Sequence, residues 1–367
     1  MESRRFDIPE WSRIHGDETT IDTGLRLHFS PEDEVYVTFI QRRQQTELAS
    51  ESNPEKSGTV FNALFFSKED GSLVKRHEWP TMGELAIKDQ IAHGSRLFPL
   101  PNGGYVGIIY RQLQVLDSSL KVLHSRKLDR LEQRLYRLIV PKCGPYFVLA
   151  QVYTRVDTNI EVFDTRSFEI VEQLNMPDLG ILDIWEDRLL AVGLREIPGK
   201  YRSHRLYFRE KRIGEDRWAK IGLEEQPGHS SAGYTNTGAI VVNDTIPGLN
   251  RPEYRDRWFI MDNGKKGEPV VYAGRDRPGT SIPARSAPIM AVRMGREDRI
   301  RAALDMDNSA ISWIDVLDLR TSKRLLRTRT TRFMLEFALS SDGRRLAVLT
   351  DKTLELYNVP VPEETKK

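Results

Sequence analysis

Two arginine-rich segments, 244–257 and 273–288, carry the side chains best suited to binding an anionic group. The guanidinium group of Arg is a planar fork of donors that fits carboxylates and phosphates. Four acids share these segments, so the alternative is that ion pairing among the side chains orders the two loops. The acids are Asp244, Glu253, Asp256 and Asp276. The predicted ligand-binding residues are Arg251, Tyr254, Arg255, Arg257, Arg275, Arg277 and Arg285.

Histidines are the second group that could do chemistry. Two or three of them could bind a metal ion together with Glu78 or Asp89. None shows ligand spacing such as His-x-x-x-His, so no metal site is predicted. The candidates are His77, His93, His204 and His229. His28, on an inner strand, is expected to pack inside the central channel.

Searches for catalytic motifs find no nucleophile elbow, no phosphate-binding glycine loop and no Cys-x-x-Cys pair. The segment Asp305-Met-Asp307-Asn308 lacks the Gly and the distal Glu of a calcium loop. Cys143 is the one cysteine, so the sequence predicts no disulfide within the chain. No catalytic residue and no cofactor are predicted.

A repeated pattern of strand, tight turn and strand must position these side chains. It is clearest at Phe337-Ala-Leu-Ser-Ser-Asp-Gly-Arg-Arg-Leu-Ala-Val-Leu-Thr350. The first residue of the second strand recurs at Val35, Tyr105, Tyr146, Leu189, Ala239, Ile300 and Leu346, with spacings of 70, 41, 43, 50, 61 and 46 residues. A period of about 40 to 50 residues is typical of four-stranded propeller blades.

A second pattern runs in phase with the first. An apolar run ends in an acid, a turn follows, and another β-rich run begins, as in Val162-Phe-Asp164 before Phe168-Glu-Ile-Val171. Asp favours such corners because its side chain can accept hydrogen bonds from the backbone a little further on. Leu346, Val348, Val37 and Val106 are therefore predicted to be buried between blades.

The last repeat ends before its fourth strand. We expect residues from Arg4 to about Ile14 to supply it by pairing outside 353–358, which closes a ring and covers an exposed edge. The predicted fold is an all-β, seven-bladed β-propeller of four-stranded antiparallel blades, in a single domain over 1–367. The expected blades are about 24–80, 96–129, 136–176, 180–222, 230–274, 288–330, and 332–359 together with 4–15.

On these repeats the chain resembles the bacterial seven-bladed propellers of the WD40-like and YVTN-like superfamily, over about residues 4–359. The Trp-Asp pair of eukaryotic WD40 repeats is absent. The resemblance implies a fold that hosts scaffolds, lactonases and quinone-dependent dehydrogenases.

Composition narrows the function further. A net charge of +2, with 39 Arg and 16 Lys, argues against a dedicated nucleic-acid binder. No run approaches the roughly 20 apolar residues of a membrane span. No signal peptide is seen at Met1, so the cytoplasm is the default compartment; removal of a leader would indicate a secreted or periplasmic protein. A monomer is expected.

Loop lengths differ between the two faces of the predicted ring. The turns between first and second strands are short, whereas insertions fall on the opposite face, at 41–58, 76–96, 195–204, 244–257 and 273–288. Binding residues concentrate on loops of a rigid scaffold. We therefore predict a non-catalytic propeller that binds a protein or peptide through the long-loop face or the channel mouth. The alternative is a propeller enzyme, a lactonase-like hydrolase or a quinone-dependent dehydrogenase subunit, with its site at the channel mouth.

Overall fold

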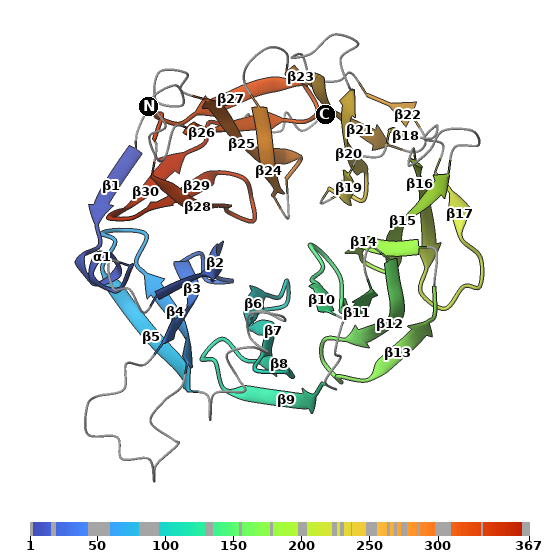
Figure 1. The fold of residues 1–367 in the computed structure, drawn as a ribbon, viewed down its shortest axis with the longest axis horizontal. Helices are drawn as coiled ribbons and strands as arrows, with labels where there is room; N and C mark the ends of the chain where they lie inside the picture. The colour runs from blue at the N-terminus through green and yellow to red at the C-terminus, as the bar shows by residue number, and fades with distance from the viewer. Residues whose placement is uncertain are drawn as a thin grey trace, which may run out of the picture.

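The computed structural model describes the strand framework of the chain. The described residues are 3–15, 20–42, 59–80, 95–128, 135–153, 156–176, 179–196, 204–221, 226–227, 231–235, 237–246, 255–262, 265–267, 270–272, 277–284, 287–297, 310–331 and 333–361. Within them the strands form seven antiparallel sheets of four or five strands, which follow one another around an axis (Figure 1). Strands such as β6, β19 and β28 lie nearest the axis, and β5, β9 and β13 lie at the rim.

The first sheet contains β2 (Thr20–Phe29), β3 (Val35–Arg42), β4 (Thr59–Phe66) and β5 (Leu73–Pro80). The second contains β6 (Arg96–Pro99), β7 (Tyr105–Ile109), β8 (Gln112–Leu116) and β9 (Val122–Lys127). The third contains β10 (Leu135–Ile139), β11 (Tyr146–Tyr153), β12 (Val156–Asp164) and β13 (Ile170–Leu174). The fourth and fifth sheets contain β14 (Leu179–Trp185), β15 (Arg188–Glu196), β16 (His204–Arg212), β17 (Ala219–Lys220) and β18 (Gln226–Pro227); and β19 (Ser231–Tyr234), β20 (Ile240–Ile246), β21 (Arg255–Asp262), β22 (Lys265–Lys266) and β23 (Val270–Tyr272). The last two contain β24 (Arg277–Pro283), β25 (Ile289–Glu297), β26 (Ala310–Asp318) and β27 (Lys323–Arg327); and β28 (Met334–Leu339), β29 (Arg345–Thr350), β30 (Thr353–Asn358) and β1 (Ser3–Asp7).

The clearest repeat folds as the pattern predicts. Ser340 donates its hydroxyl to Asp342 at 2.7 Å and accepts the backbone N–H of Arg345 at 2.9 Å, which closes the turn between β28 and β29. Gly343 has a φ of +72°, and a Cβ there would lie 2.8 Å from the Cβ of Ile289, so the turn needs glycine. The predicted burial is confirmed: Leu346, Val348, Val37 and Val106 are each at most 1% exposed.

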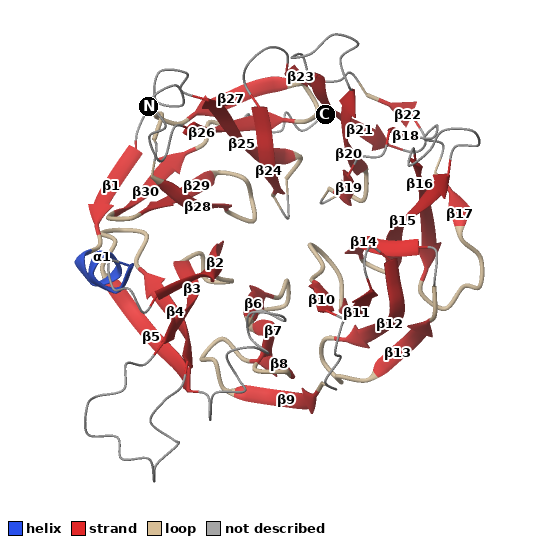
Figure 2. Ribbon diagram, in the orientation of Figure 1, coloured by secondary structure: helices blue, strands red, loops and turns tan. Residues whose placement is uncertain are grey.

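The N-terminal segment pairs with the last sheet but does so over a shorter stretch than expected. Strand β1 runs antiparallel to β30, from Ser3 opposite Tyr357 to Asp7 opposite Thr353. The prediction that pairing continues to Ile14 is wrong, because Pro9–His15 forms helix α1 (Figure 2). Pro is favoured at the first helical position, where no backbone N–H is needed.

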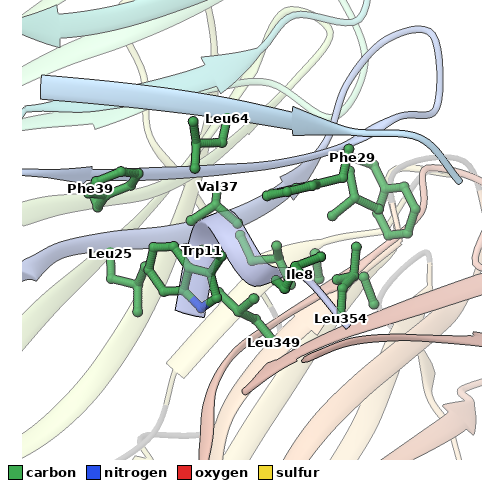
Figure 3. Close-up of a cluster of buried hydrophobic side chains, with 14 of the residues drawn as sticks. Ile8, Trp11, Leu25, Phe29, Val37, Phe39, Leu64, Leu349 and Leu354 are labelled. Atoms are coloured by element: carbon green, nitrogen blue, oxygen red, sulfur yellow. The ribbon is translucent and has the colours of Figure 1, made fainter. Parts of the chain in front are cut away.

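Helix α1 belongs to the core rather than to the surface. Trp11 and Ile14 are three residues apart on one face of the helix, and both are buried, as is Ile8 directly before it. Trp11 donates its indole N–H to the carbonyl of Thr350 at 3.0 Å and meets the ring of Phe39 edge-on at 5.4 Å. Figure 3 shows Ile8 and Trp11 between residues of the first sheet and of the last.

The sixth sheet corrects the register expected from sequence. The segment from Met290 was expected to be the inner strand, with the second strand starting at Ile300. Instead β24 is the inner strand and β25, which contains Met290, is the second. Strand β24 carries Pro278 and Pro283, which argue against a central strand, but it pairs only with β25, and an edge strand tolerates proline.

Several predicted loops are shorter than expected because strands extend into them. Residues 76–80 belong to β5, 195–196 to β15, 244–246 to β20 and 255–257 to β21. Within the predicted loop 273–288, residues 277–283 form the inner strand β24, so the end of β24 lies on the face opposite the long loops. Among the described residues, no helix is long and apolar enough to cross a membrane.

Replacing Trp11 by Ala should destabilise the protein strongly, because it removes a fully buried ring and its hydrogen bond to Thr350. The expected loss in free energy of unfolding is about 3–5 kcal/mol, measured by urea denaturation. Phe333→Ala is the control, since Phe333 is 54% exposed and should lose less than about 0.5 kcal/mol. Equal losses for the two variants would contradict the packing of α1.

Deleting residues 1–16 removes β1 and α1 and leaves the outer edge of β30 unpaired. An exposed strand edge pairs readily with other chains. We expect the truncated protein to aggregate with increasing concentration, as measured by light scattering, and to melt at a lower temperature. A truncated protein that stays monomeric and melts as the full chain does would show that this pairing is dispensable.

Candidate functional site

A cavity of about 720 Å³ lies on the axis of the molecule, among the inner strands and the short turns that follow them. Its wall comes from five sheets, the first, second, third, sixth and last in chain order. Most of the wall-forming turns join a first strand to a second, so the cavity lies at the short-turn end of the channel. The site predicted from sequence was the opposite, long-loop face or the channel mouth.

Apolar side chains make up most of the described wall. Phe98, Val140, Ile282 and Leu339 each come from a different sheet. Four prolines also line the cavity: Pro31, Pro99, Pro101 and Pro283. Proline fixes the backbone angle φ, so these residues keep the wall rigid. A preformed apolar cavity of this size is typical of a ligand-binding site.

His28 also lines the cavity, and its surroundings are aromatic. Its ring centroid lies 5.3 Å from that of Tyr36 and 5.4 Å from that of Phe98. These contacts agree with the expectation that His28 packs in the interior.

The acidic side chain of Asp33, at the rim of the cavity, is held by two cations. Its Oδ2 atom lies 2.5 Å from Nη2 of Arg345 and 3.6 Å from Nζ of Lys68. Arg345 begins β29 in the last sheet, whereas Asp33 lies in the turn after β2 in the first. The carboxylate therefore joins the two sheets at the cavity rim.

Lys142 joins the third sheet to the fourth and fifth sheets. Its Nζ lies 3.0 Å from Oδ2 of Asp183 and also donates to the carbonyl of Tyr234. Asp183, 8% exposed, accepts backbone N–H groups from Tyr234 at 2.8 Å and from Ile184 at 2.9 Å. One buried carboxylate thus connects three successive sheets.

Asp342 is the other acidic residue in the described wall of the cavity. It accepts the hydroxyl of Ser340 and the backbone N–H of Arg344 at 3.0 Å, so it caps its own turn. Together with the pairs of Asp33 and Lys142, this leaves the charged groups of the described wall bonded within the fold. Such a wall can bind an apolar group but offers no free acid–base pair.

A second layer of the channel wall carries charge. The charged residues of this layer occupy similar positions in four inner strands. Three residues before the end of its strand, β2 has Arg26, β6 has Arg96 and β28 has Glu336. Strand β10 has Arg137 two residues before its end. Arg26 Nη1 lies 3.5 Å from Oε1 of Glu336. Burial raises the pKa of Glu336, against a smaller opposing effect of Arg26 and Arg293. Burial, and next to it the charge of Arg26, lower the pKa of Arg96.

The structure locates only some of the arginines predicted from sequence. Arg255 and Arg257 lie in β21, opposite Ile246 and Asp244, and Arg277 begins β24. The predicted residues outside the described ones are Arg251, Tyr254, Arg275 and Arg285. Their role as a binding site stays a prediction.

The histidines expected on the long-loop face are dispersed. His77 lies within β5, with its ring 4.2 Å from that of Trp79, and burial lowers its pKa. Glu78, the proposed companion ligand, is 2.6 Å from Arg76. His204 begins β16, and His93, His229 and Asp89 lie outside the described residues. Among the described side chains no group of three potential metal ligands occurs.

The channel residues could not be recognised from the sequence, because their neighbours in space come from other sheets of the fold. The available signal was weak: arginines precede the short turn by similar distances in three successive repeats, at Arg26, Arg96 and Arg137. Read singly, each is an ordinary polar residue in a strand.

No protein-family model matches the sequence, and no curated protein matches it either. Solved structures do match. The WD40 domain of coronin from Toxoplasma gondii is 8% identical, with a TM-score of 0.52, over 100% of this chain and 88% of that one. Hydrazine synthase of Kuenenia stuttgartiensis is 14% identical, with a TM-score of 0.48, over 95% of this chain and 99% of that one. At these identities the coronin match concerns the fold alone: the chain has a WD40-like β-propeller fold of four-stranded antiparallel blades.

Replacing Lys142 by Met should leave the buried carboxylate of Asp183 without its cation. Breaking one side of such a pair is strongly destabilising, and we expect a loss of about 3 kcal/mol in free energy of unfolding. Lys68→Met is the matched control, because both partners of the Lys68–Asp33 pair are about a third exposed and the loss should stay under about 1 kcal/mol. Chemical denaturation of both variants measures the difference, and equal losses would contradict the bridging role of Asp183.

Proposed function

We propose that this protein is a non-catalytic binding or scaffold protein that recognises a protein or peptide partner. The observation that carries the proposal is the cavity on the channel axis, with its volume of about 720 Å³ and its largely apolar wall. Pockets of roughly 300–1,000 Å³ with such walls bind apolar groups. An apolar side chain of a partner, inserted at the short-turn end, would bury its surface against Phe98, Val140 and Ile282.

The bonding of the cavity's charged groups supports binding over catalysis. An acid or base catalyst needs a group free to exchange a proton with substrate. Asp33, Asp342 and Lys142 are instead committed to ion pairs and turn hydrogen bonds. This favours the binding function over the hydrolase or dehydrogenase alternative at this end of the channel.

We also propose that the seven sheets are seven blades of one closed ring, a single domain over 1–367. The pairing of β1 with β30, and the core shared by α1 with the first and last sheets, support closure. A place among bacterial YVTN-like propellers and a monomeric state are part of the same proposal. The net charge of +2 supports a partner other than nucleic acid.

The long-loop face is the second candidate surface for the partner. Its predicted contacts are the arginines of segment 244–257 with Arg275 and Arg277; Arg285 follows inner strand β24 in the sequence and is left out. Of these, Arg255 and Arg257 are placed on a strand next to the loop, which is a rigid position for a binding residue. The two surfaces are separated by the length of the channel, so mutations can distinguish them.

A randomised peptide library selected against the immobilised protein tests the proposal. Selected peptides are then measured by fluorescence anisotropy against variants that fill the cavity, Val140→Arg and Ile282→Arg. We expect each variant to weaken peptide binding at least tenfold, because a long charged side chain would occupy the apolar space. Lys323→Ser, an exposed change on outer strand β27, is the control and should leave affinity unchanged.

A variant of the long-loop face completes the experiment. Replacing Arg251, Arg255, Arg275 and Arg277 together by Ser should leave cavity-bound peptides unaffected. If this variant abolishes binding while Val140→Arg and Ile282→Arg do not, the binding face is the long-loop face predicted from sequence. Failure to select any peptide in repeated experiments would contradict peptide recognition.

A further inference from the structure

Among the described residues, one arginine in the charged layer of the channel wall has no counter-charge. The layer comprises Arg26, Arg96, Arg137 and Glu336, and the charge of Arg293 on strand β25 also acts on Glu336. Alternate residues of a strand share a face. His28, Phe98 and Ala338 line the axial cavity, so Arg26, Arg96 and Glu336, each two residues earlier in its strand, face the same way.

Most of these arginines have partners within the fold. Arg26 pairs with Glu336 at 3.5 Å and donates to the carbonyl of Leu25 at 2.6 Å. Arg137 donates to the carbonyl of Ile181 on the next sheet. Arg293 donates to the carbonyl of Met334 at 3.2 Å.

Arg96 differs from the others. It is half-buried, and among the described residues no carboxylate lies within ion-pair distance of it and no hydrogen bond of its guanidinium group is found. Arg26, on the neighbouring inner strand β2, carries the same sign of charge and helps to lower the pKa of Arg96. A partly desolvated cation beside a like charge is unfavourable unless an anion neutralises it.

We infer that the channel binds an oxyanion, a carboxylate or a phosphate group, at Arg96, with Arg26 as the second cation of the site. The planar fork of a guanidinium group donates two parallel hydrogen bonds to either anion. Glu336 supports the site by pairing with Arg26 from the other side, so that Arg26 is held in place without being fully neutralised. This anion site lies deeper in the channel than the apolar cavity and does not depend on peptide recognition there.

Binding of sodium phosphate and of sodium acetate, each compared with sodium chloride at equal ionic strength, tests the inference. The readouts are the melting temperature and isothermal titration calorimetry. We expect at least one of the two anions to raise the melting temperature of the unaltered protein in a saturable manner. The phosphate and acetate arms show whether the site prefers a tetrahedral or a planar oxyanion.

Arg96→Met should weaken that binding at least tenfold, and Arg96→Lys should weaken it less, because Lys keeps the charge and loses the fork. Arg324→Met on exposed strand β27 is the matched control and should bind as the unaltered protein does. In chloride alone, Arg96→Met should melt no lower than the unaltered protein, since it removes an uncompensated charge.

Three results would overturn the inference. One is the absence of a saturable response to either anion. Another is equal anion affinity in Arg96→Met and the unaltered protein, which would place the anion elsewhere. The third is a large loss of melting temperature for both Arg96→Met and Arg96→Lys in chloride, which would show that Arg96 has a structural partner in the fold.

Discussion

The structure depends on the pairing of strand β1 with strand β30, which brings the two ends of the chain into one sheet. A blade buries its faces only against neighbouring blades, and an unpaired outer edge would attract other chains. The core next to this pairing takes Trp11 from the N-terminal helix, Leu25 from the first sheet, and Leu349 and Leu354 from the last. The most distant parts of the sequence therefore stabilise each other directly.

The channel follows from this arrangement. Each inner strand pairs on one side only, so its other edge faces the axis, where polar groups need partners of their own. The short turns supply many of these partners, as with Ser340 and Asp342, and ion pairs such as Lys142–Asp183 join one sheet to the next. The charged groups at this end are bonded within the fold, and most of the side chains around the space are apolar.

The same wall has a different chemistry further along. Three inner strands place an arginine near one level, and one carboxylate, Glu336, faces them. Burial disfavours the charged forms of Glu336 and Arg96 alike, which is why the pKa of the acid is raised and that of the base is lowered. The channel wall is therefore mostly apolar at the short-turn end and mostly cationic further in. An elongated ligand would bind in one orientation.

Local chemistry allowed the sequence alone to determine much of the blade structure. Alternating apolar residues and Ser-Asp-Gly turns specify strands and corners, so the burial of Leu346 and Val37 and the need for a completing N-terminal strand could be predicted. Two elements were predicted wrongly from the local sequence. The prolines of β24 argue against a strand, but β24 lies at the edge of its sheet, where proline is tolerated, and only the strand pairing shows this. At α1, a helix replaces the expected strand. The cavity and the surroundings of Arg96 could not be predicted, because residues far apart in sequence meet there. Only the tertiary structure, by setting the register of each sheet against the next, decided which charges face one another across the axis.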